Sequence, residues 1–312
     1  MAVQTKSRSD TTLIERAARR LGTQATRPDL GPAAAAEPER VPPAIGNIAS
    51  PQPTGPANRL LRPTETPRSS PTLEIDLARL KEQGIITPDT VRSKTTEEMR
   101  LIKRRVLANF LQTEQKNANL IVVTSALASE GKTFVALNLA MSLAFEKDFR
   151  VLLVDADVAK PAINRRLGIE PREGLTDLLA DPDRDVASVL LKTNVDSLSI
   201  IQAGTPHELN TELLASKRMI GLLDEIASRY SDRIVIFDSP PVLVTTEAST
   251  LLQNMGQVVF VVQAGRTSRQ AVEEALELIQ DCPHIGLVMN QAEERWGSVH
   301  FGTYYGKYYK KE

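Results

Sequence analysis

Residues 120–133 read LIVVTSALASEGKT, and the rest of the fold can be worked out from this stretch. Its first five residues form an apolar run typical of a buried strand. Residues 126–133 match the phosphate-loop pattern G-x-x-x-x-G-K-[ST], with Ala126 in place of the first glycine. Residues 134–146 have the apolar content of a helix. An accidental strand–turn–helix corner is the alternative, but the three parts follow in the order that phosphate binding requires. We therefore expect a nucleotide site at this loop.

Each part of the loop has an expected role. Backbone N–H groups turn inward around the phosphates, and the helix N-terminus adds partial positive charge. Lys132 neutralises phosphate oxygens, and the Thr133 hydroxyl ligates Mg²⁺. The expected cofactors are therefore ATP and Mg²⁺. The loop residues predicted to contact the nucleotide are Ala126, Leu127, Ala128, Ser129, Glu130, Gly131, Lys132 and Thr133.

The composition divides the chain into three parts. Over all 312 residues the net charge is −1, which gives no signature of nucleic-acid binding. Residues 1–72 contain no Phe, Trp or Tyr and hold 11 of the 19 prolines, so we expect a disordered Pro/Ala-rich extension. Within it, residues 12–21 have helical spacing and favour a transient helix over a docking helix. We expect a P-loop domain with N-terminal helices over residues 73–300 and a flexible Tyr-rich tail over residues 301–312.

The apolar content and the cysteine count of the sequence indicate where in the cell the protein is expected. The sequence has no apolar run near the roughly 18 residues that a membrane helix needs, and its N-terminus lacks the apolar core of a secretory signal. Cys282 is the single cysteine, so no intramolecular disulfide can form. Together these features predict a soluble, cytoplasmic protein.

Apolar runs and amphipathic segments alternate along the chain. Continuous Val/Ile/Leu strands separated by helices predict an α/β fold, with a mostly parallel P-loop NTPase-type sheet covered by helices on both faces. The expected strands are 120–124, 151–155, 198–203, 234–238, 258–263 and 286–290. The expected helices are 73–83, 95–110, 132–146, 210–230, 247–254 and 268–280.

Three carboxylates follow two of these predicted strands. Asp155 ends the run at 151–155, Asp157 follows two positions later, and Asp238 ends the run at 234–238. Ligands of such sheets bind at the carboxyl ends of the strands, so these acids are expected to lie near the phosphate loop. Asp238 is the natural candidate to hold Mg²⁺ opposite Thr133. Taken singly, each of these acids could equally be an ordinary residue at the end of a strand or an N-cap residue.

The three motifs together resemble Walker A, Walker A′ and Walker B of the bacterial tyrosine kinases found in exopolysaccharide loci. Further matches are Gly174-Leu175-Thr176-Asp177-Leu178-Leu179, Gly204 followed by Asn210-Thr211-Glu212-Leu213-Leu214-Ala215-Ser216, and Gly286-Leu287-Val288-Met289-Asn290. The resemblance extends from Thr95 to the C-terminus. The phrases at 155–161 and 237–241 are most similar to the autokinase branch of exosortase-associated, PEP-CTERM-type clusters.

This resemblance implies an ATP-dependent, non-specific protein-tyrosine kinase that phosphorylates its own tail and regulates exopolysaccharide biosynthesis and export. It implies Asp157 as the base, Asp155 in the metal–water shell, Asp238 and Thr133 at the metal, and Asn290 among the nucleotide-binding residues, with Lys132 stabilising charge. The implied phosphate acceptors are Tyr304, Tyr305, Tyr308 and Tyr309. Because aromatic tails also dock on partners, composition alone does not separate the two uses of the tail.

The resemblance also implies partners. These are a membrane chain-length or co-polymerase protein that recruits and activates the kinase at the inner face of the membrane, and a phosphotyrosine phosphatase. Glu97, Arg100 and Lys103 resemble the E-x-x-R-x-x-R helix that joins family members into rings, which implies a homo-oligomer. The alternative for these three residues is a solvated helix face with intrahelical pairs.

Two departures from the family pattern leave other functions open. Ala126 replaces a glycine, and Ala159 stands where many members have arginine, with Lys160 beside it. A non-catalytic nucleotide-binding scaffold is one alternative. A partitioning or septum-site ATPase is another, but those families carry a signature lysine where this chain has Leu127.

Overall fold

The computed structural model describes residues 72–292, except 91–92, 113–114, 116, 147, 231, 246–247 and 249–250. The extension expected before residue 72, the helix considered at 12–21 and the tail at 301–312 lie outside the described residues. No helix in the described part of the chain combines the length and the apolar content needed to cross a bilayer.

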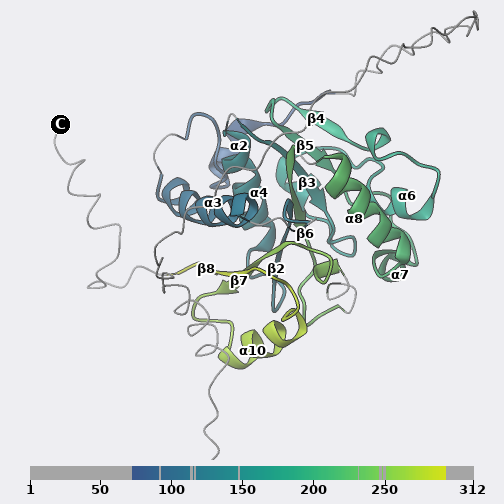
Figure 1. Ribbon diagram of the computed structural model, residues 1–312. Coiled ribbons are helices and arrows are strands. Elements are labelled where there is room, and N and C mark those ends of the chain that lie inside the picture. Colours follow the sequence, from purple (N-terminus) through teal and green to yellow (C-terminus); the bar gives the residue numbers. More distant parts are fainter. Residues whose placement is uncertain are drawn as a thin grey trace, which may run out of the picture. The chain divides into compact units, whose positions relative to one another are not determined.

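The described residues form one eight-stranded sheet with the order β1-β4-β5-β3-β6-β2-β7-β8 (Figure 1). All neighbouring strands are parallel except β4 and β5, which are antiparallel. The mostly parallel α/β sheet expected from the sequence is therefore confirmed. The strands are β1 (Thr72–Leu73), β2 (Leu120–Ser125), β3 (Arg150–Asp155), β4 (Leu191–Thr193), β5 (Leu198–Ile201), β6 (Arg233–Asp238), β7 (Gln257–Gln263) and β8 (Ile285–Asn290).

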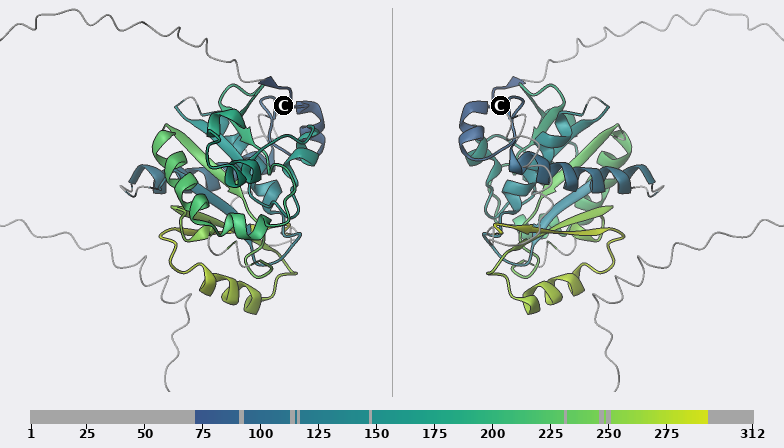
Figure 2. Two further views of the ribbon diagram at one scale, coloured as in Figure 1. Left: turned by 90° about the vertical axis from the view of Figure 1, so that its right-hand side faces the viewer. Right: turned by 90° about the vertical axis from the view of Figure 1, so that its left-hand side faces the viewer.

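Helices cover both faces of this sheet (Figures 1 and 2). The side chains of β2 show the division, because Leu120 and Val122 join one buried cluster and Ile121 and Val123 join the other. The first cluster includes side chains of α6, α8 and α10, and the second includes side chains of α2, α3 and α4. The helices are α2 (Leu77–Glu82), α3 (Lys94–Gln112), α4 (Lys132–Ala144), α5 (Ile163–Leu167), α6 (Leu175–Ala180), α7 (Asn210–Leu214), α8 (Lys217–Arg229) and α10 (Arg269–Leu278), with a 3-10 turn at Val186–Ser188.

Two of the expected helices differ from the structure by more than a residue or two at their ends. The helix expected from residue 73 begins at Leu77, because the Asp76 carboxylate caps it by accepting the Arg79 N–H at 3.0 Å. The single helix expected over 210–230 is two helices. Ser216 interrupts it and caps α8 by accepting the Met219 N–H at 3.2 Å. The sequence prediction was therefore wrong where a short polar side chain starts a new helix.

The helix expected at 247–254 is only partly described. Ala248, Leu251 and Leu252 are helical and buried, while four of its residues are not described. The short elements β1, β4, α5 and α6 were not predicted.

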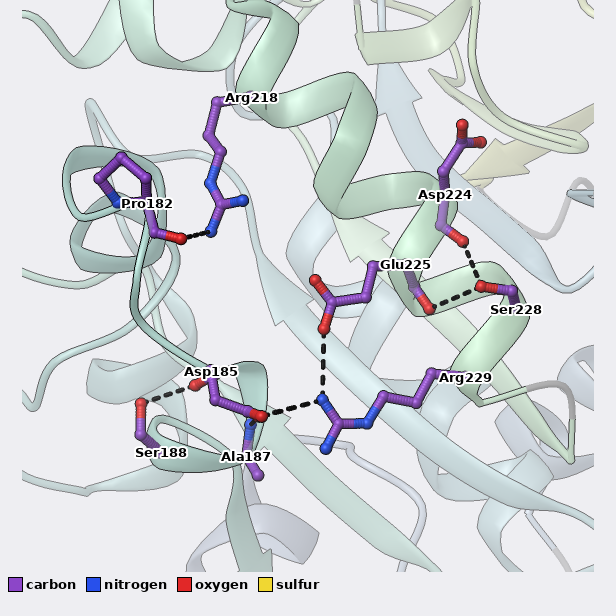
Figure 3. Close-up of polar contacts among 9 residues, drawn as sticks. All are labelled: Pro182, Asp185, Ala187, Ser188, Arg218, Asp224, Glu225, Ser228 and Arg229. Carbon is purple, nitrogen blue, oxygen red and sulfur yellow. Dashed lines mark hydrogen bonds and ion pairs between the residues drawn. The ribbon is translucent and has the colours of Figure 1, made fainter.

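Polar contacts join α8 to the segment at residues 182–188 (Figure 3). Arg229 Nη1 lies 3.0 Å from Asp185 Oδ1 and 3.2 Å from Glu225 Oε1. Arg218 donates to the Pro182 carbonyl at 2.9 Å. The side chains of the Arg229 ion pairs are about half exposed, so their contribution to stability is small beside the burial of Leu222 and Ile226.

Candidate active site

The phosphate-loop sequence forms the connection between β2 and α4. Gly131 precedes the helix with φ +96°, and a Cβ atom at this position would lie 2.0 Å from Asn290 Nδ2. The positive φ favours glycine at 131, and a larger residue there would also displace the Asn290 amide. Ala126 is fully buried and does not have a positive φ, so its Cβ atom is accommodated in place of the usual glycine.

Asp155 and Asp238 lie opposite each other at the ends of the neighbouring strands β3 and β6. Both side chains are fully buried. Asp155 Oδ2 accepts the Ile163 N–H at 3.1 Å, whereas its Oδ1 has no hydrogen-bond partner among the described residues. Neither carboxylate oxygen of Asp238 has a hydrogen bond of ordinary geometry to the described residues. The site therefore holds three buried carboxylate oxygens without such a bond.

Lys132 and Asp157 form a loose ion pair beside these carboxylates. Lys132 Nζ lies 3.8 Å from Asp157 Oδ2, and both side chains are largely buried. Asp157 Oδ1 also accepts the Lys160 N–H at 3.3 Å. This backbone contact fixes Asp157 without occupying the oxygen that faces Lys132.

Burial raises the pKa of all three carboxyl groups. It raises the pKa of Asp238 to about 7, against the lowering effects of the Thr133 hydroxyl and the Lys132 charge. It raises the pKa of Asp155 well above the usual value, and the charge of Asp238 adds to this shift. The pKa of Asp157 is raised mainly by burial, and the charge of Lys132 opposes the shift. Perturbed carboxyl groups beside a phosphate loop are typical of a functional site.

The residues present fit a magnesium ion. Asp238 and Thr133 offer oxygen atoms, which Mg²⁺ prefers, and neither Asp238 oxygen has a hydrogen bond of ordinary geometry to the described residues. The described residues contain no group of three His, Cys, Asp or Glu side chains able to hold a metal by themselves. A magnesium site here would therefore depend on few protein ligands, with water and phosphate completing it, as is usual for Mg²⁺.

The structure brings most of the predicted site residues to the carboxyl ends of the strands. Asn290, at the end of β8, contacts the phosphate loop directly by donating to the Glu130 carbonyl at 2.9 Å. The predicted tyrosine acceptors lie outside the described residues. A contact that sequence reasoning missed is the hydrogen bond from the Thr267 hydroxyl to the Glu130 carboxylate. No motif in the sequence marks Thr267.

The predicted oligomerisation residues make contacts within the chain. Arg100 Nη1 lies 2.7 Å from Glu97 Oε1, one helical turn away on α3. Lys103 pairs with Glu146 and donates to the Ser142 carbonyl at 3.4 Å. The intrahelical ion pairing that the sequence offered as the alternative is therefore present between Glu97 and Arg100.

Comparison with known proteins extends this description. A family model described as an AAA domain matches residues 118–288. The putative tyrosine-protein kinase EpsB of Ralstonia nicotianae is 33% identical over 207 residues, which cover 65% of this chain and 27% of that protein. The tyrosine-protein kinase YwqD of Bacillus subtilis is 29% identical over 67% of this chain and 86% of that protein. The chain thus spans about a quarter of the length of EpsB and most of YwqD.

Solved structures give the same picture. The chimerical protein CapA2B2 aligns with a TM-score of 0.60 and 26% identity, over 72% of this chain and 96% of that one. The BceF tyrosine kinase domain aligns with a TM-score of 0.57 and 25% identity, over 70% of this chain and 91% of that domain. The VpsO kinase domain aligns with a TM-score of 0.52 and 30% identity, over 64% of this chain and 100% of that domain.

Proposed function

The chain belongs to the AAA domain family, and the relatives named above are bacterial tyrosine kinases, so we propose that it is a kinase as well. In this proposal it transfers the γ-phosphoryl group of ATP to its own tyrosines. The observation that carries the proposal is the pairing of Lys132 with Asp157 beside the fully buried carboxylate of Asp238. In this proposal Lys132 is the phosphate-binding cation, Asp157 the base and Asp238 a metal ligand, all near the carboxyl ends of the central strands β2, β3 and β6.

The phosphate loop binds the nucleotide in this proposal. Its backbone N–H groups and the N-terminus of α4 face the phosphates, and Lys132 neutralises charge that develops during transfer. Asp238 and Thr133 would hold Mg²⁺, and Asp155 would lie in the surrounding water shell. When bound, the ion neutralises charge on the β- and γ-phosphates and orients them.

Asp157 orients the acceptor tyrosine and takes its proton. Its raised pKa makes it a better base than an exposed aspartate. A phenol has a pKa near ~10, however, so Asp157 contributes mainly through position. The 3.8 Å separation from Lys132 is compatible with both groups turning to their own substrate atoms. Most of the rate acceleration then comes from preorganised charge.

The acceptors in this proposal are Tyr304, Tyr305, Tyr308 and Tyr309. The motif resemblance supports a role in exopolysaccharide biosynthesis and export, with a membrane co-polymerase protein as activator and a phosphotyrosine phosphatase as antagonist. It also supports recruitment of this chain to the inner face of the cell membrane by that activator.

We also propose a homo-oligomer formed through α3. The Glu97–Arg100 pair and the Lys103–Glu146 pair would exchange for pairs between subunits. Native mass spectrometry of the unphosphorylated protein tests this, and a monomer at micromolar concentration contradicts it.

Incubation of the purified chain with γ-labelled ATP and Mg²⁺ tests the proposed reaction. Transfer of label to tyrosine supports the kinase. Release of free phosphate without labelled protein would indicate an ATPase, and nucleotide binding without turnover would indicate a scaffold. Leu127, in place of the signature lysine, argues against the partitioning ATPases.

A further inference from the structure

Glu130 lies within the phosphate loop, yet its carboxylate points into the protein. Its side chain is only 2% exposed. Among the described residues its side-chain partners are a backbone amide and a hydroxyl group: Oε2 accepts the Leu127 N–H at 2.7 Å, and Oε1 accepts the Thr267 hydroxyl. Burying a carboxylate is costly unless hydrogen bonds satisfy it, so these two contacts identify a structural purpose for the side chain.

The first contact closes the loop on itself. Glu130 binds the N–H of Leu127, while the Ser125 hydroxyl donates to the Leu127 carbonyl at 2.7 Å. Between these residues Ser129 has φ +69°, a left-handed conformation that is unfavourable for a residue with a side chain. The side chains of Ser125 and Glu130 therefore hold the loop in a curve that its backbone would not keep alone.

The second contact ties the loop to a different part of the chain. Thr267 lies between β7 and α10, and its hydroxyl oxygen accepts the Gln263 N–H at 3.1 Å. This bond orients the hydroxyl so that its single proton is directed to Glu130. Ser268, the next residue, is the N-cap of α10, so the Thr267 hydroxyl does not cap this helix. The turn after β7 is therefore built to present one donor to the loop.

A third contact reinforces the same connection. Asn290 donates to the Glu130 carbonyl at 2.9 Å, and its own carbonyl accepts the Ala264 N–H at 2.9 Å. Glu130 is thus held by its backbone from β8 and by its side chain from the β7–α10 turn. The phosphate loop is braced from the sheet edge formed by β7 and β8.

From these contacts we propose that Glu130 and Thr267 are positioning residues of the nucleotide site. They hold the loop in its phosphate-binding curve before nucleotide arrives. Preorganisation of this kind raises affinity, because the loop does not have to be ordered on binding. The inference rests on the proposed nucleotide binding and adds a residue, Thr267, that contacts the loop but is outside the phosphate-binding motif.

The test compares Thr267→Val, which keeps the side-chain shape and removes the hydroxyl, with Thr267→Ser, which restores the hydroxyl. The full chain is titrated with ADP and Mg²⁺ by calorimetry, and ATP-dependent labelling is measured over a range of ATP concentrations. We expect Thr267→Val to weaken ADP binding roughly tenfold and to raise KM more than it lowers kcat. Thr267→Ser should recover most of the affinity.

Thr193→Val is the matched control. Thr193 is a buried threonine whose hydroxyl likewise makes hydrogen bonds, here to two carbonyl groups, but it lies on β4, toward the other edge of the sheet. This control should lower the thermal midpoint and leave ADP affinity unchanged.

Three results would overturn the inference: unchanged ADP affinity in Thr267→Val, an equal loss of affinity in the Thr193→Val control, or failure of serine to rescue. If wild-type protein itself binds no nucleotide, the proposed function fails, whereas wild-type binding matched by Thr267→Val counts against the inference alone.

Discussion

Asp155 and Asp238 are register partners at the ends of β3 and β6, and the Ala156 N–H donates to the Asp238 carbonyl at 2.8 Å. Two fully buried carboxyl groups are thereby fixed side by side by the backbone of the sheet. Such an arrangement is unfavourable when both are charged, because burial and mutual repulsion add. The same pair of charged carboxylates becomes favourable when a cation is bound between the sheet and the phosphates, because the cation offsets their negative charge.

Asp238→Asn should therefore stabilise the metal-free protein at neutral and higher pH. The folded-state pKa of Asp238 is about 7, above the ordinary 3.8, so the folded state retains a proton that the unfolded chain loses. The free energy of unfolding of the wild type should fall as pH rises from about 4 to 7 and then level off. The variant lacks this titration and should be roughly 1–4 kcal/mol more stable at pH 8.

Urea unfolding at pH 5 and pH 8 in the presence of a chelator measures this difference. Asp185→Asn is the control, because the pKa of Asp185 is lowered by its hydrogen bond to the Ala187 N–H and by Arg229. Its native form therefore favours the charged carboxylate, so this variant should gain no stability at pH 8. An Asp238→Asn protein less stable than wild type at pH 8 without metal would contradict the account.

Gly131→Ala should disrupt nucleotide binding. The new Cβ atom would meet Asn290 Nδ2 at 2.0 Å on a backbone with φ +96°, so either the Asn290 amide gives up its hydrogen bond to the Glu130 carbonyl or the loop moves. We expect at least about a tenfold loss of affinity for ADP, measured by calorimetry. Gly221→Ala is the control. Gly221 lies in α8 with open space around its Cβ position, so alanine there should stabilise the protein by about 0.5–1 kcal/mol and leave ADP affinity unchanged.

Asp157→Asn should separate catalysis from binding. The amide keeps the shape and still accepts the Lys160 N–H, but it can neither take the tyrosine proton nor pair with Lys132. We expect phosphorylation to fall about 100-fold or more while ADP binding persists. A correctly folded Asp157→Asn protein that phosphorylates itself at the wild-type rate would show that another group acts as base.

Two substitutions on α8 should differ in their effect on stability. Ile226 is fully buried, and its replacement by alanine should cost about 2–5 kcal/mol in urea unfolding. Arg229 forms exposed ion pairs with Asp185 and Glu225, so Arg229→Ala should cost less than about 1 kcal/mol. Equal losses would mean that the contacts in Figure 3 contribute more than exposed pairs usually do.

The long apolar strands were predictable because each is a continuous Val/Ile/Leu run. The strand expected at 151–155, for example, is observed as Arg150–Asp155. In contrast, β1 has two residues and β4 has three, which is too short for a periodic signal. The same limit applies to α5 and α6, with five and six residues.

The phosphate loop was predictable because its residues have a fixed spacing, and the carboxylates because each follows the end of an apolar strand. The contacts that link these residues to the rest of the sheet were not predictable. Thr267 reaches Glu130 across 137 positions of sequence, and Asn290 reaches the same residue across 160. Such contacts depend on the order of β2, β7 and β8 in the sheet, which no local pattern contains.

Phosphosite mapping tests the central claim most directly. Wild type and Lys132→Met are incubated with ATP and Mg²⁺, digested, and analysed by tandem mass spectrometry. The account predicts phosphotyrosine at some or all of Tyr304, Tyr305, Tyr308 and Tyr309 in the wild type and none in Lys132→Met. Absence of phosphotyrosine from wild-type protein that binds ATP, or equal phosphorylation of Lys132→Met, would contradict it.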